Sequence, residues 1–249
     1  MKYSDIKVSC ADCSLSELCL PRGLNEAELH ELDNAIEHKY KCDRDAYLYR
    51  NGDELHAIYA VRSGSFKATA TTAEGVEQVV GFYLPGELLG LDAFADHKHT
   101  CNVVALESST VCELPFPEFE TLCGQLSGLR KQLMHLVGRE ITSGNRMLLA
   151  LGQMTAEERL ATFLMSLSKR FEDRGFSTTD FNLSMPRHDL ANYIGIAVET
   201  VSRLFARMQK EGLIEVDRRK ISILDIDRLS ALAHERCLPA EIPLASSTH

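Results

Sequence analysis

RHDLANYIGIAVETVSRLFARMQK, residues 187–210, places apolar side chains at the spacing of two short helices on either side of a glycine turn. We predict helices over residues 187–193 and 199–210, joined by a tight turn. Gly195 provides the permissive backbone that this turn needs, and Ala191 is small enough for the helices to cross closely. The stretch therefore predicts a helix-turn-helix. The apolar positions that lock the two helices at a steep angle are Leu190, Ala191, Ile194, Ile196, Val201 and Leu204.

A short β-hairpin with a basic tip is predicted directly after these helices. Residues 213–216 and 221–224 are rich in aliphatic residues, and Arg218, Arg219 and Lys220 lie between them. A helix-turn-helix followed by such a wing is typical of DNA-binding domains, in which the second helix presents its first turn to the major groove. The alternative is a helical hairpin whose charged residues only face solvent.

The candidate base-reading residues are four polar residues at the start of the second helix, namely Glu199, Thr200, Ser202 and Arg203. Arg203 can bind guanine O6 and N7 with two donors, Glu199 can accept a hydrogen bond from cytosine N4, and Ser202 can contact the bases of either strand. On the wing, Arg218 and Lys220 are candidate phosphate contacts. Phosphate contacts supply affinity without base identity.

The formal net charge of −9 is unevenly distributed along the chain. Residues 153–237 contain 13 basic and 13 acidic residues, so the other 14 basic and 23 acidic residues carry the whole excess. Within the neutral part, residues 203–220 hold six basic residues against three acidic ones. The protein thus keeps a modest basic stripe, and its net charge does not exclude a nucleic-acid partner.

Upstream of the helix-turn-helix, we predict a long helix with a heptad seam. Apolar or small residues recur in alternating steps of three and four over about two and a half heptads, which is the pattern of a coiled coil. A second copy of the same helix is the natural partner, and packing on the chain's own β-domain is the alternative. Gly144 in the seam costs roughly 1 kcal/mol of helix stability relative to Ala, but it lets two backbones approach closely. The predicted dimer interface is Arg130, Met134, Val137, Ile141, Gly144, Leu148 and Leu151.

Residues 45–114 have the composition of an all-β domain. Glycines recur about every 11 residues from Gly52 to Gly86, and the runs between them are short and β-rich. This spacing favours a β-sandwich or β-roll, preceded by a short amphipathic helix within residues 25–37. The predicted strands cover residues 57–61, 66–71, 79–84, 102–106 and 110–114.

Taken in order, these segments predict an α+β chain of five parts. A chain of 249 residues has room for about two domains with ordinary cores. The predicted parts are an N-terminal thiol-rich loop (1–22), a β-roll sensor domain (23–125), a dimerisation helix (126–152), a winged helix-turn-helix domain (153–237) and a disordered tail (238–249).

Three cysteines, Cys10, Cys13 and Cys19, lie within ten residues in the sequence CADCSLSELC. Three soft ligands on a short loop suit an iron-sulfur cluster or zinc, and such sites usually take a fourth ligand from elsewhere. Thiols without a metal-binding role are the third possibility. Spacing alone leaves these alternatives open. One C-x2-C without a second one falls short of the paired pattern of a zinc ribbon, but a zinc site with four cysteines remains possible.

Several classes of protein are disfavoured by what the sequence lacks. The N-terminus has no apolar signal-peptide core, and there is no run of about 18 apolar residues, so we predict a cytoplasmic protein without a membrane span. Eight cysteines in a reducing compartment favour metal binding, redox chemistry or burial over a disulfide framework. The chain contains no P-loop, no G-x-G-x-x-G and no H-E-x-x-H motif, so we do not predict an enzyme.

The order of thiol-rich N-terminus, β-roll, long helix and winged helix-turn-helix resembles the superfamily of the cyclic-AMP receptor protein. Within it, the chain is most similar to the fumarate and nitrate reduction regulator family, the oxygen-sensing branch of these bacterial transcription regulators. The resemblance covers nearly the whole chain and implies a jelly-roll β-domain of the cyclic-nucleotide-binding type. It rests on C-x2-C-x5-C at residues 10–19, ALESSTVCELPF at residues 105–116 and VETVSRL at residues 198–204.

By that resemblance, Cys112 is the fourth ligand of a [4Fe-4S] cluster that Cys10, Cys13 and Cys19 also bind. The resemblance further implies a homodimer that binds an inverted repeat like TTGAT-N4-ATCAA on double-stranded DNA while the cluster is intact. Oxygen would dismantle the cluster and weaken pairing. An activator of this kind would contact RNA polymerase through the turn at residues 72–75. The alternatives are a regulator of the same fold that senses nitric oxide or holds zinc, and a structural metal-binding protein that does not touch DNA.

Two positions depart from the patterns of the superfamily. Cyclic-nucleotide binders carry a Gly-Glu pair and then an Arg-Ser pair for the phosphate, whereas this chain keeps Gly86 and Glu87 but has His99 and Thr100 at the second pair. Without that arginine a phosphate loses its bidentate partner, so a cyclic nucleotide is not expected to bind. Oxygen sensors of the family tend to carry an acidic residue on the dimer seam where this chain has Gly144. The repulsion between like charges that such a residue provides is therefore missing.

Overall fold

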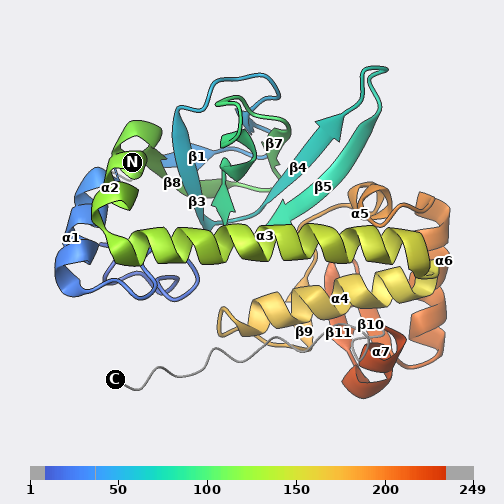
Figure 1. Cartoon of the computed structure of the whole chain (residues 1–249). Helices are drawn as coiled ribbons and strands as arrows, with labels where there is room; N and C mark the ends of the chain where they lie inside the picture. Colours follow the sequence, from blue (N-terminus) through green and yellow to red (C-terminus); the bar gives the residue numbers. More distant parts are fainter. Residues whose placement is uncertain (1–8, 37, 234–249) are drawn as a thin grey trace, which may run out of the picture. The chain divides into compact units, whose positions relative to one another are not determined.

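Two four-stranded antiparallel sheets form the core of the N-terminal unit, as the computed structural model shows for the described residues 9–36 and 38–233 (Figure 1). The chain divides into two compact units between Arg146 and Met147. The predicted disordered tail, residues 238–249, lies outside the described residues.

The strands follow the order β1-β8-β3-β6 in one sheet and β2-β7-β4-β5 in the other. The predicted β-roll and its five predicted strands are confirmed. Three additional strands, β1, β2 and β6, were not predicted. Strands β2 and β6 have only three and two residues, too few to show an alternation of apolar and polar residues, and β1 lies before the predicted β-region of residues 45–114. The bounds are β1 His38–Cys42, β2 Tyr47–Tyr49, β3 Ala57–Ser63, β4 Phe66–Thr71, β5 Glu77–Tyr83, β6 Leu88–Leu89, β7 Asn102–Ala105 and β8 Ser109–Pro115.

Each face of the β1-β8-β3-β6 sheet has its own apolar core. Val111 belongs to the core between the two sheets, whereas Ile58 and Leu114 belong to a second core that also contains residues of the helices. Cys112 pairs with Ala60 across the strands, and both lie on the second face because successive strand residues alternate sides. Strand β8 therefore presents the Cys112 thiol to the outer face of the sheet, where the helices pack.

Two short helices contribute to this outer core. Helix α1 (Glu26–Ala35) confirms the predicted amphipathic helix and begins with a capping box between Asn25 and Glu28. Helix α2 (Phe116–Gln125) follows β8 without a loop. Both helices bury apolar side chains in the core on the outer face of the sheet.

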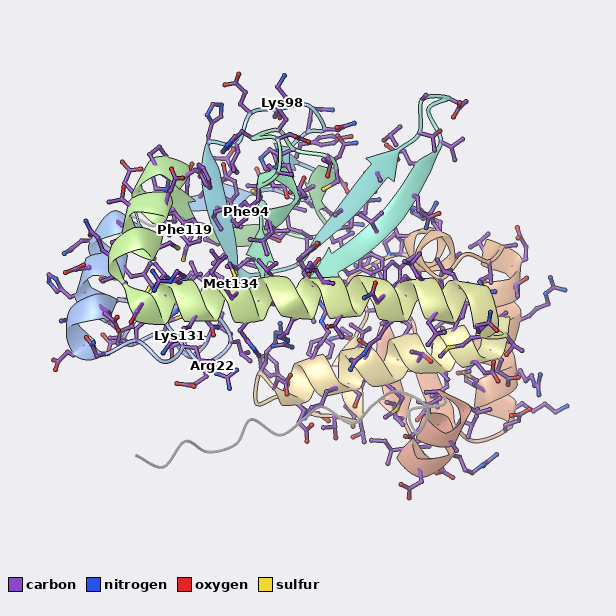
Figure 2. The ribbon with its side chains drawn as sticks, viewed as in Figure 1. Arg22, Phe94, Lys98, Phe119, Lys131 and Met134 are labelled. Atoms are coloured by element: carbon purple, nitrogen blue, oxygen red, sulfur yellow. The ribbon has the colours of Figure 1, made fainter. Side chains whose placement is uncertain are left out.

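Helix α3 (Ser127–Gln153), on which Figure 2 labels Met134, has one face in the outer core and another face that is exposed. Near its beginning, Leu129 and Leu133 are buried in the outer core. On another face of the helix, Met134 and Ile141 are 60% and 61% exposed. Of the two alternatives for this helix, packing on the chain's own β-domain holds for its first turns and includes Val137 of the predicted seam. The other apolar seam residues, Met134, Ile141, Leu148 and Leu151, are exposed.

The C-terminal unit contains a helix-turn-helix and a β-hairpin wing. Helices α5 and α6 confirm the two predicted helices, and the β10-β11 hairpin confirms the predicted wing. Within the described part of the chain, no helix combines the length and the apolar composition that crossing a lipid bilayer requires. The bounds are α4 Ala156–Glu172, β9 Asp180–Asn182, α5 Arg187–Tyr193, α6 Val198–Lys210, β10 Ile214–Asp217, β11 Lys220–Ile223 and α7 Ile226–Leu232.

Gly195 forms the turn between α5 and α6 with a φ angle of +67°, which glycine adopts far more easily than other residues. A Cβ atom at this position would lie 2.9 Å from Leu151 Cδ2 and 3.3 Å from Arg159 Nη1. We expect Gly195→Ala to lower the free energy of unfolding by about 1 to 2 kcal/mol through its left-handed backbone, with a smaller added cost because the ends of the Leu151 and Arg159 side chains must shift. Denaturant unfolding followed by circular dichroism measures this loss.

Gly212 provides the matched control for this prediction. Its φ angle is +69°, but a Cβ atom there would meet nothing within 4 Å. Gly212→Ala should therefore show the backbone cost alone, roughly 1 to 2 kcal/mol. Equal losses in the two variants would contradict a packing contribution at Gly195.

Candidate metal centre and DNA interface

The three N-terminal cysteines lie on a thiol loop, residues 9–23, that is folded by successive tight turns. The Cys13 N–H donates to the carbonyl oxygen of Cys10 at 3.3 Å, and the Cys19 N–H donates to that of Leu15 at 3.1 Å. These local hydrogen bonds give the loop a compact backbone without a helix or a strand. The three cysteines, which are close in the sequence, are therefore also held close together in space.

Side chains from two helices fasten the thiol loop near both ends. Asp33 of α1 accepts the Cys10 N–H at 2.9 Å through Oδ1. Gln132 of α3 donates from Nε2 to the carbonyl oxygen of Cys19 at 2.9 Å. Leu20, only 3% exposed, adds an apolar anchor in the outer core. No motif in the sequence points to Asp33 or Gln132, and only their contacts identify them.

The structure brings Cys10, Cys13, Cys19 and Cys112 together. The pKa of the Cys10 thiol is raised to about 12, first by burial and then by the charges of Asp33, Cys112 and Cys13. The pKa of Cys19 is also raised to about 12, chiefly by burial, with added repulsion from the other three thiols. These side chains are close enough to influence one another's ionisation. At neutral pH such thiols stay protonated on their own, so thiolates would form here only together with a cationic group that binds them.

A single metal ion and a cluster make different geometric demands on such a set. Among the described residues, no three His, Cys, Asp or Glu side chains are grouped as ligands of one metal ion would be. In a [4Fe-4S] cluster each cysteine binds a different iron atom, so the four thiolates stand farther apart. Four soft ligands from a loop and a strand, beside an apolar core, fit the chemistry of a cluster.

The other described cysteines belong to different surroundings. Cys42 and Cys101 are buried in the core between the sheets, and Cys101 donates to Asp92 at 3.4 Å. Cys123 is half-buried on α2. None of these three thiols is among the groups that raise the pKa of Cys10 or Cys19.

His99 and Thr100, at the position of the phosphate-binding pair, are engaged within the β-roll. His99 is 3% exposed, and its ring stacks on Tyr49 with the centroids 3.6 Å apart. Asp92 accepts the Thr100 N–H at 2.8 Å and lies 3.3 Å from His99 Nδ1. Burial acts to raise the pKa of Asp92, but hydrogen bonds from His99, Thr100 and Cys101 outweigh it and lower the pKa. The pair therefore serves a buried polar network.

Helix α6 exposes most of the predicted base-reading residues. Glu199, Ser202 and Arg203 are exposed, and Thr200 is half-buried. Ser202 Oγ donates to the carbonyl oxygen of Val198 at 3.1 Å, and Arg203 Nε donates to that of Glu199 at 3.4 Å. Both bonds are to the helix's own backbone and are exposed, so a DNA base can replace them. The opposite face of α6 is buried through Val201, Phe205 and Met208.

The wing carries two arginines at its tip. Strands β10 and β11 pair as far as Asp217 and Lys220, so Arg218 and Arg219 form a two-residue turn. Arg218 has a φ angle of +56°, which costs a non-glycine residue about 1 to 2 kcal/mol. Lys220 Nζ lies 3.3 Å from Asp180 Oδ1 of β9, a pairing that the sequence does not indicate. The charge of Lys220 is therefore partly balanced within the fold.

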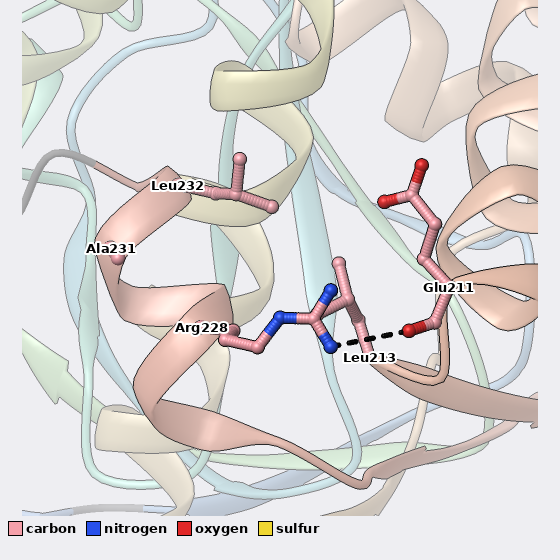
Figure 3. A pocket seen from close by; sticks show the side chains of 5 residues that line it. All are labelled: Glu211, Leu213, Arg228, Ala231 and Leu232. Carbon is pink, nitrogen blue, oxygen red and sulfur yellow. Dashed lines mark hydrogen bonds between the residues drawn. The ribbon is translucent and has the colours of Figure 1, made fainter.

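A hollow of about 300 Å³ lies between the end of α6 and α7 (Figure 3). Arg228 reaches across it and donates from Nη1 to the carbonyl oxygen of Glu211 at 3.3 Å. Its guanidinium also lies 3.7 Å from Asp225 Oδ2. Because this cation is already engaged, we assign the hollow to the packing of the domain. The lining residues are Glu211, Leu213, Arg228, Ala231 and Leu232.

Two family models match the chain. The model of the Crp-like helix-turn-helix domain matches residues 158–232, which include α5, α6 and the wing. The model of the cyclic nucleotide-binding domain matches residues 40–125, which include most of the β-roll.

Relatives are similar to this chain over nearly its whole length. The fumarate and nitrate reduction regulatory proteins of Salmonella typhimurium and Escherichia coli K12 are each 46% identical over 226 residues, covering 91% of this chain and 90% of their own. The anaerobic regulatory protein of Haemophilus influenzae is 46% identical over 225 residues, covering 90% of this chain and 88% of its own. All three are named as regulatory proteins, which agrees with the expectation that the chain is not an enzyme.

Solved structures share the fold. FixK2 from Bradyrhizobium japonicum has a TM-score of 0.73 and 25% identity, and the match covers 78% of this chain and 96% of that one. A transcriptional regulator of the CRP family from Thermus thermophilus has a TM-score of 0.62 and covers 78% of this chain and 96% of that one. Its identity of 18% shows likeness of fold alone.

Proposed function

The chain belongs to the fumarate and nitrate reduction regulator family, and we propose that this transcription regulator, with its DNA-binding helix-turn-helix, is controlled by an oxygen-labile [4Fe-4S] cluster. Cys10, Cys13, Cys19 and Cys112 would hold the cluster. The observation that carries the proposal is that Cys19 and Leu20 of the thiol loop pack in the outer core beside Ala60, which pairs with Cys112 of β8, far away in the sequence.

Residues other than the cysteines support the proposed site. Asp33 holds the beginning of the thiol loop, Leu20 buries its end, and β8 presents Cys112 on the face that the loop covers. When bound, the cluster would supply a link between loop and strand that oxygen destroys. The chain would therefore convert the presence of oxygen into the release of its N-terminal loop.

The open seam of α3 supports a homodimer. Met134 and Ile141 are more than half exposed, and Gly144 has open space around its Cα atom. Two such helices could bury these side chains against each other in a coiled coil, and Gly144 would let their backbones approach. A dimer would bring two α6 helices to an inverted repeat, for which TTGAT-N4-ATCAA is the expected sequence.

The turn between β4 and β5 is the proposed contact with RNA polymerase. The Gly75 N–H donates to the carbonyl oxygen of Thr72 at 3.0 Å. A hydrogen bond from the Thr72 side chain and one from the backbone of Glu74 lower the pKa of the Glu74 carboxyl. Val76 beside them is 62% exposed. An ordered turn with an exposed carboxylate and an exposed valine suits a protein contact. A contact with RNA polymerase would make this regulator an activator, and it would act in the cytoplasm.

Anaerobic purification tests the proposed cluster. The visible absorption spectrum and the iron and sulfide content are measured before and after air is admitted, beside binding to an inverted-repeat duplex at several salt concentrations. We expect a coloured protein with about four iron and four sulfide per chain, whose duplex binding weakens in air. A colourless protein with bound zinc would contradict the iron-sulfur assignment, and an absence of salt-dependent duplex binding would contradict the DNA function.

We predict that Arg203→Ala removes discrimination at one G·C pair in each half-site. Arg203 and Glu199 are four residues apart on one face of α6, so one can fork onto guanine while the other accepts from cytosine. The loss should be about 1 to 3 kcal/mol per half-site for the preferred base pair. Anaerobic binding to duplexes varied at each half-site position measures it.

Arg218→Ala is the matched control for this prediction, because it removes the same charge from the wing. It should weaken binding to all sequences alike and reduce the salt dependence, since phosphates carry no base identity. If Arg203→Ala instead lowers affinity uniformly and keeps discrimination at the G·C pair, Arg203 is a phosphate contact.

A further inference from the structure

Gln132 is a buried polar side chain on an otherwise apolar face of α3. It is 7% exposed, and Leu129 and Leu133 beside it belong to the outer core of the N-terminal unit. Buried polar groups cost free energy unless they are hydrogen-bonded, so a glutamine here needs a partner. That partner is the carbonyl oxygen of Cys19, which accepts from Gln132 Nε2 at 2.9 Å.

This hydrogen bond joins the thiol loop to the helix that carries the open seam. Cys19 is the last cysteine of the loop, and Leu20 after it is fixed in the outer core. On α3, Met134 follows Gln132 by two positions and therefore lies about 200° farther round the helix. Gln132 thus faces the loop while Met134 faces the open side. A movement of the Cys19 carbonyl oxygen would therefore displace Gln132 and, with it, the buried face of α3.

We infer that Gln132 is the positioning residue that couples the state of the thiol loop to the pairing of α3 helices. The inference rests on the proposed function, because it requires a cluster on the loop and a dimer through α3. Thiolates fixed on a cluster leave the Cys19 carbonyl oxygen in one position, where it can hold Gln132 and the helix in one setting. A released loop must lose conformational entropy to make the same bond, so the bond then contributes little.

Asp33 shows why the coupling is assigned to Gln132. Both side chains hold the backbone of a loop cysteine at 2.9 Å. Asp33, however, lies on α1, which carries none of the seam residues. Asp33 therefore reaches α3 only through the packing of α1 in the outer core, whereas Gln132 joins the loop directly to the helix of the proposed dimer.

The experiment measures the dimer dissociation constant of each variant with and without cluster, by anaerobic sedimentation, beside its iron and sulfide content. Gln132→Met and Gln132→Leu keep apolar packing and remove the donor, and Gln125→Met makes the same change at an exposed position of α2. In the unaltered protein and in Gln125→Met, we expect the cluster to tighten the dimer by a factor on the order of ten or more. In both Gln132 variants we expect full cluster content and a ratio within about threefold of one.

The ratio separates coupling from a merely structural role. A structural role would weaken the dimer equally with and without cluster, and an unchanged ratio in the Gln132 variants would overturn the inference. Loss of the cluster from both variants would also overturn it, because Gln132 would then serve cluster retention. If the unaltered protein holds no cluster, its iron and sulfide content shows that the proposed function itself has failed, before any dimer is measured.

Discussion

Cys112→Ser is expected to abolish cluster retention. A [4Fe-4S] cluster needs four thiolates, and Cys112 is the one proposed ligand outside the thiol loop. A serine oxygen is a harder ligand that suits iron-sulfur chemistry poorly. Because serine has nearly the shape of cysteine, β8 should keep its pairing with Lys39 of β1 and Ala60 of β3. Iron, sulfide and visible absorption after anaerobic purification should therefore fall to background without a loss of folding.

Cys123→Ser is the matched control, because it makes the same change at a half-buried thiol on α2. We expect this variant to keep its cluster. Cys42, Cys101 and Cys237, the last of which lies outside the described residues, should be equally dispensable. Full cluster occupancy in Cys112→Ser would show that the fourth ligand lies elsewhere, and loss in Cys123→Ser would show that the assay reports folding.

The helix-turn-helix was open to prediction because its determinants are local. Gly195 marks a turn that few other residues tolerate, and its φ angle of +67° bears this out. The apolar positions around it have the period of a helix, and no distant partner is needed to recognise them. The same holds for α1, whose capping box joins Asn25 to Glu28 three residues later.

The missed features depend on partners that are distant in the sequence. Lys220 of the wing pairs with Asp180 of β9, and His99 stacks on Tyr49. Strand β6 has two residues and no pattern of its own, so it exists only because β3 offers it an edge. A single sequence contains the residues of such pairs but not their proximity.

The candidate site combines both cases. The spacing of Cys10, Cys13 and Cys19 is local and suggests a metal centre without further information. Only the family resemblance indicates Cys112, because nothing in the spacing of the chain relates it to the thiol loop. Its proximity to the loop follows from the pairing of β8 with β3, which turns its side chain toward the outer face. Gln132 has no sequence signature, because the backbone oxygen that it binds is common to every residue.

Ile141→Glu is expected to give a monomer even when the cluster is intact. Ile141 is 61% exposed in the middle of the proposed seam, so the change should leave the fold of the single chain unaffected. In a dimer, two carboxylates would be buried near each other without a cation. The cost should be about 4 kcal/mol or more, which corresponds to a rise of the dimer dissociation constant by a factor on the order of a thousand. Sedimentation and duplex binding measure the loss.

Thr142→Glu separates the seam from the charge itself, because it places the same carboxylate on the next exposed residue of α3, off the heptad positions. That variant should remain a dimer. Gly144 brings no charge to the seam, so we also expect the unaltered protein to stay partly dimeric after its cluster is removed. A clean monomer without cluster would contradict this expectation and would mean that release of the thiol loop outweighs the seam. An Ile141→Glu dimer as tight as the unaltered one would show that the two chains pair through a surface other than α3.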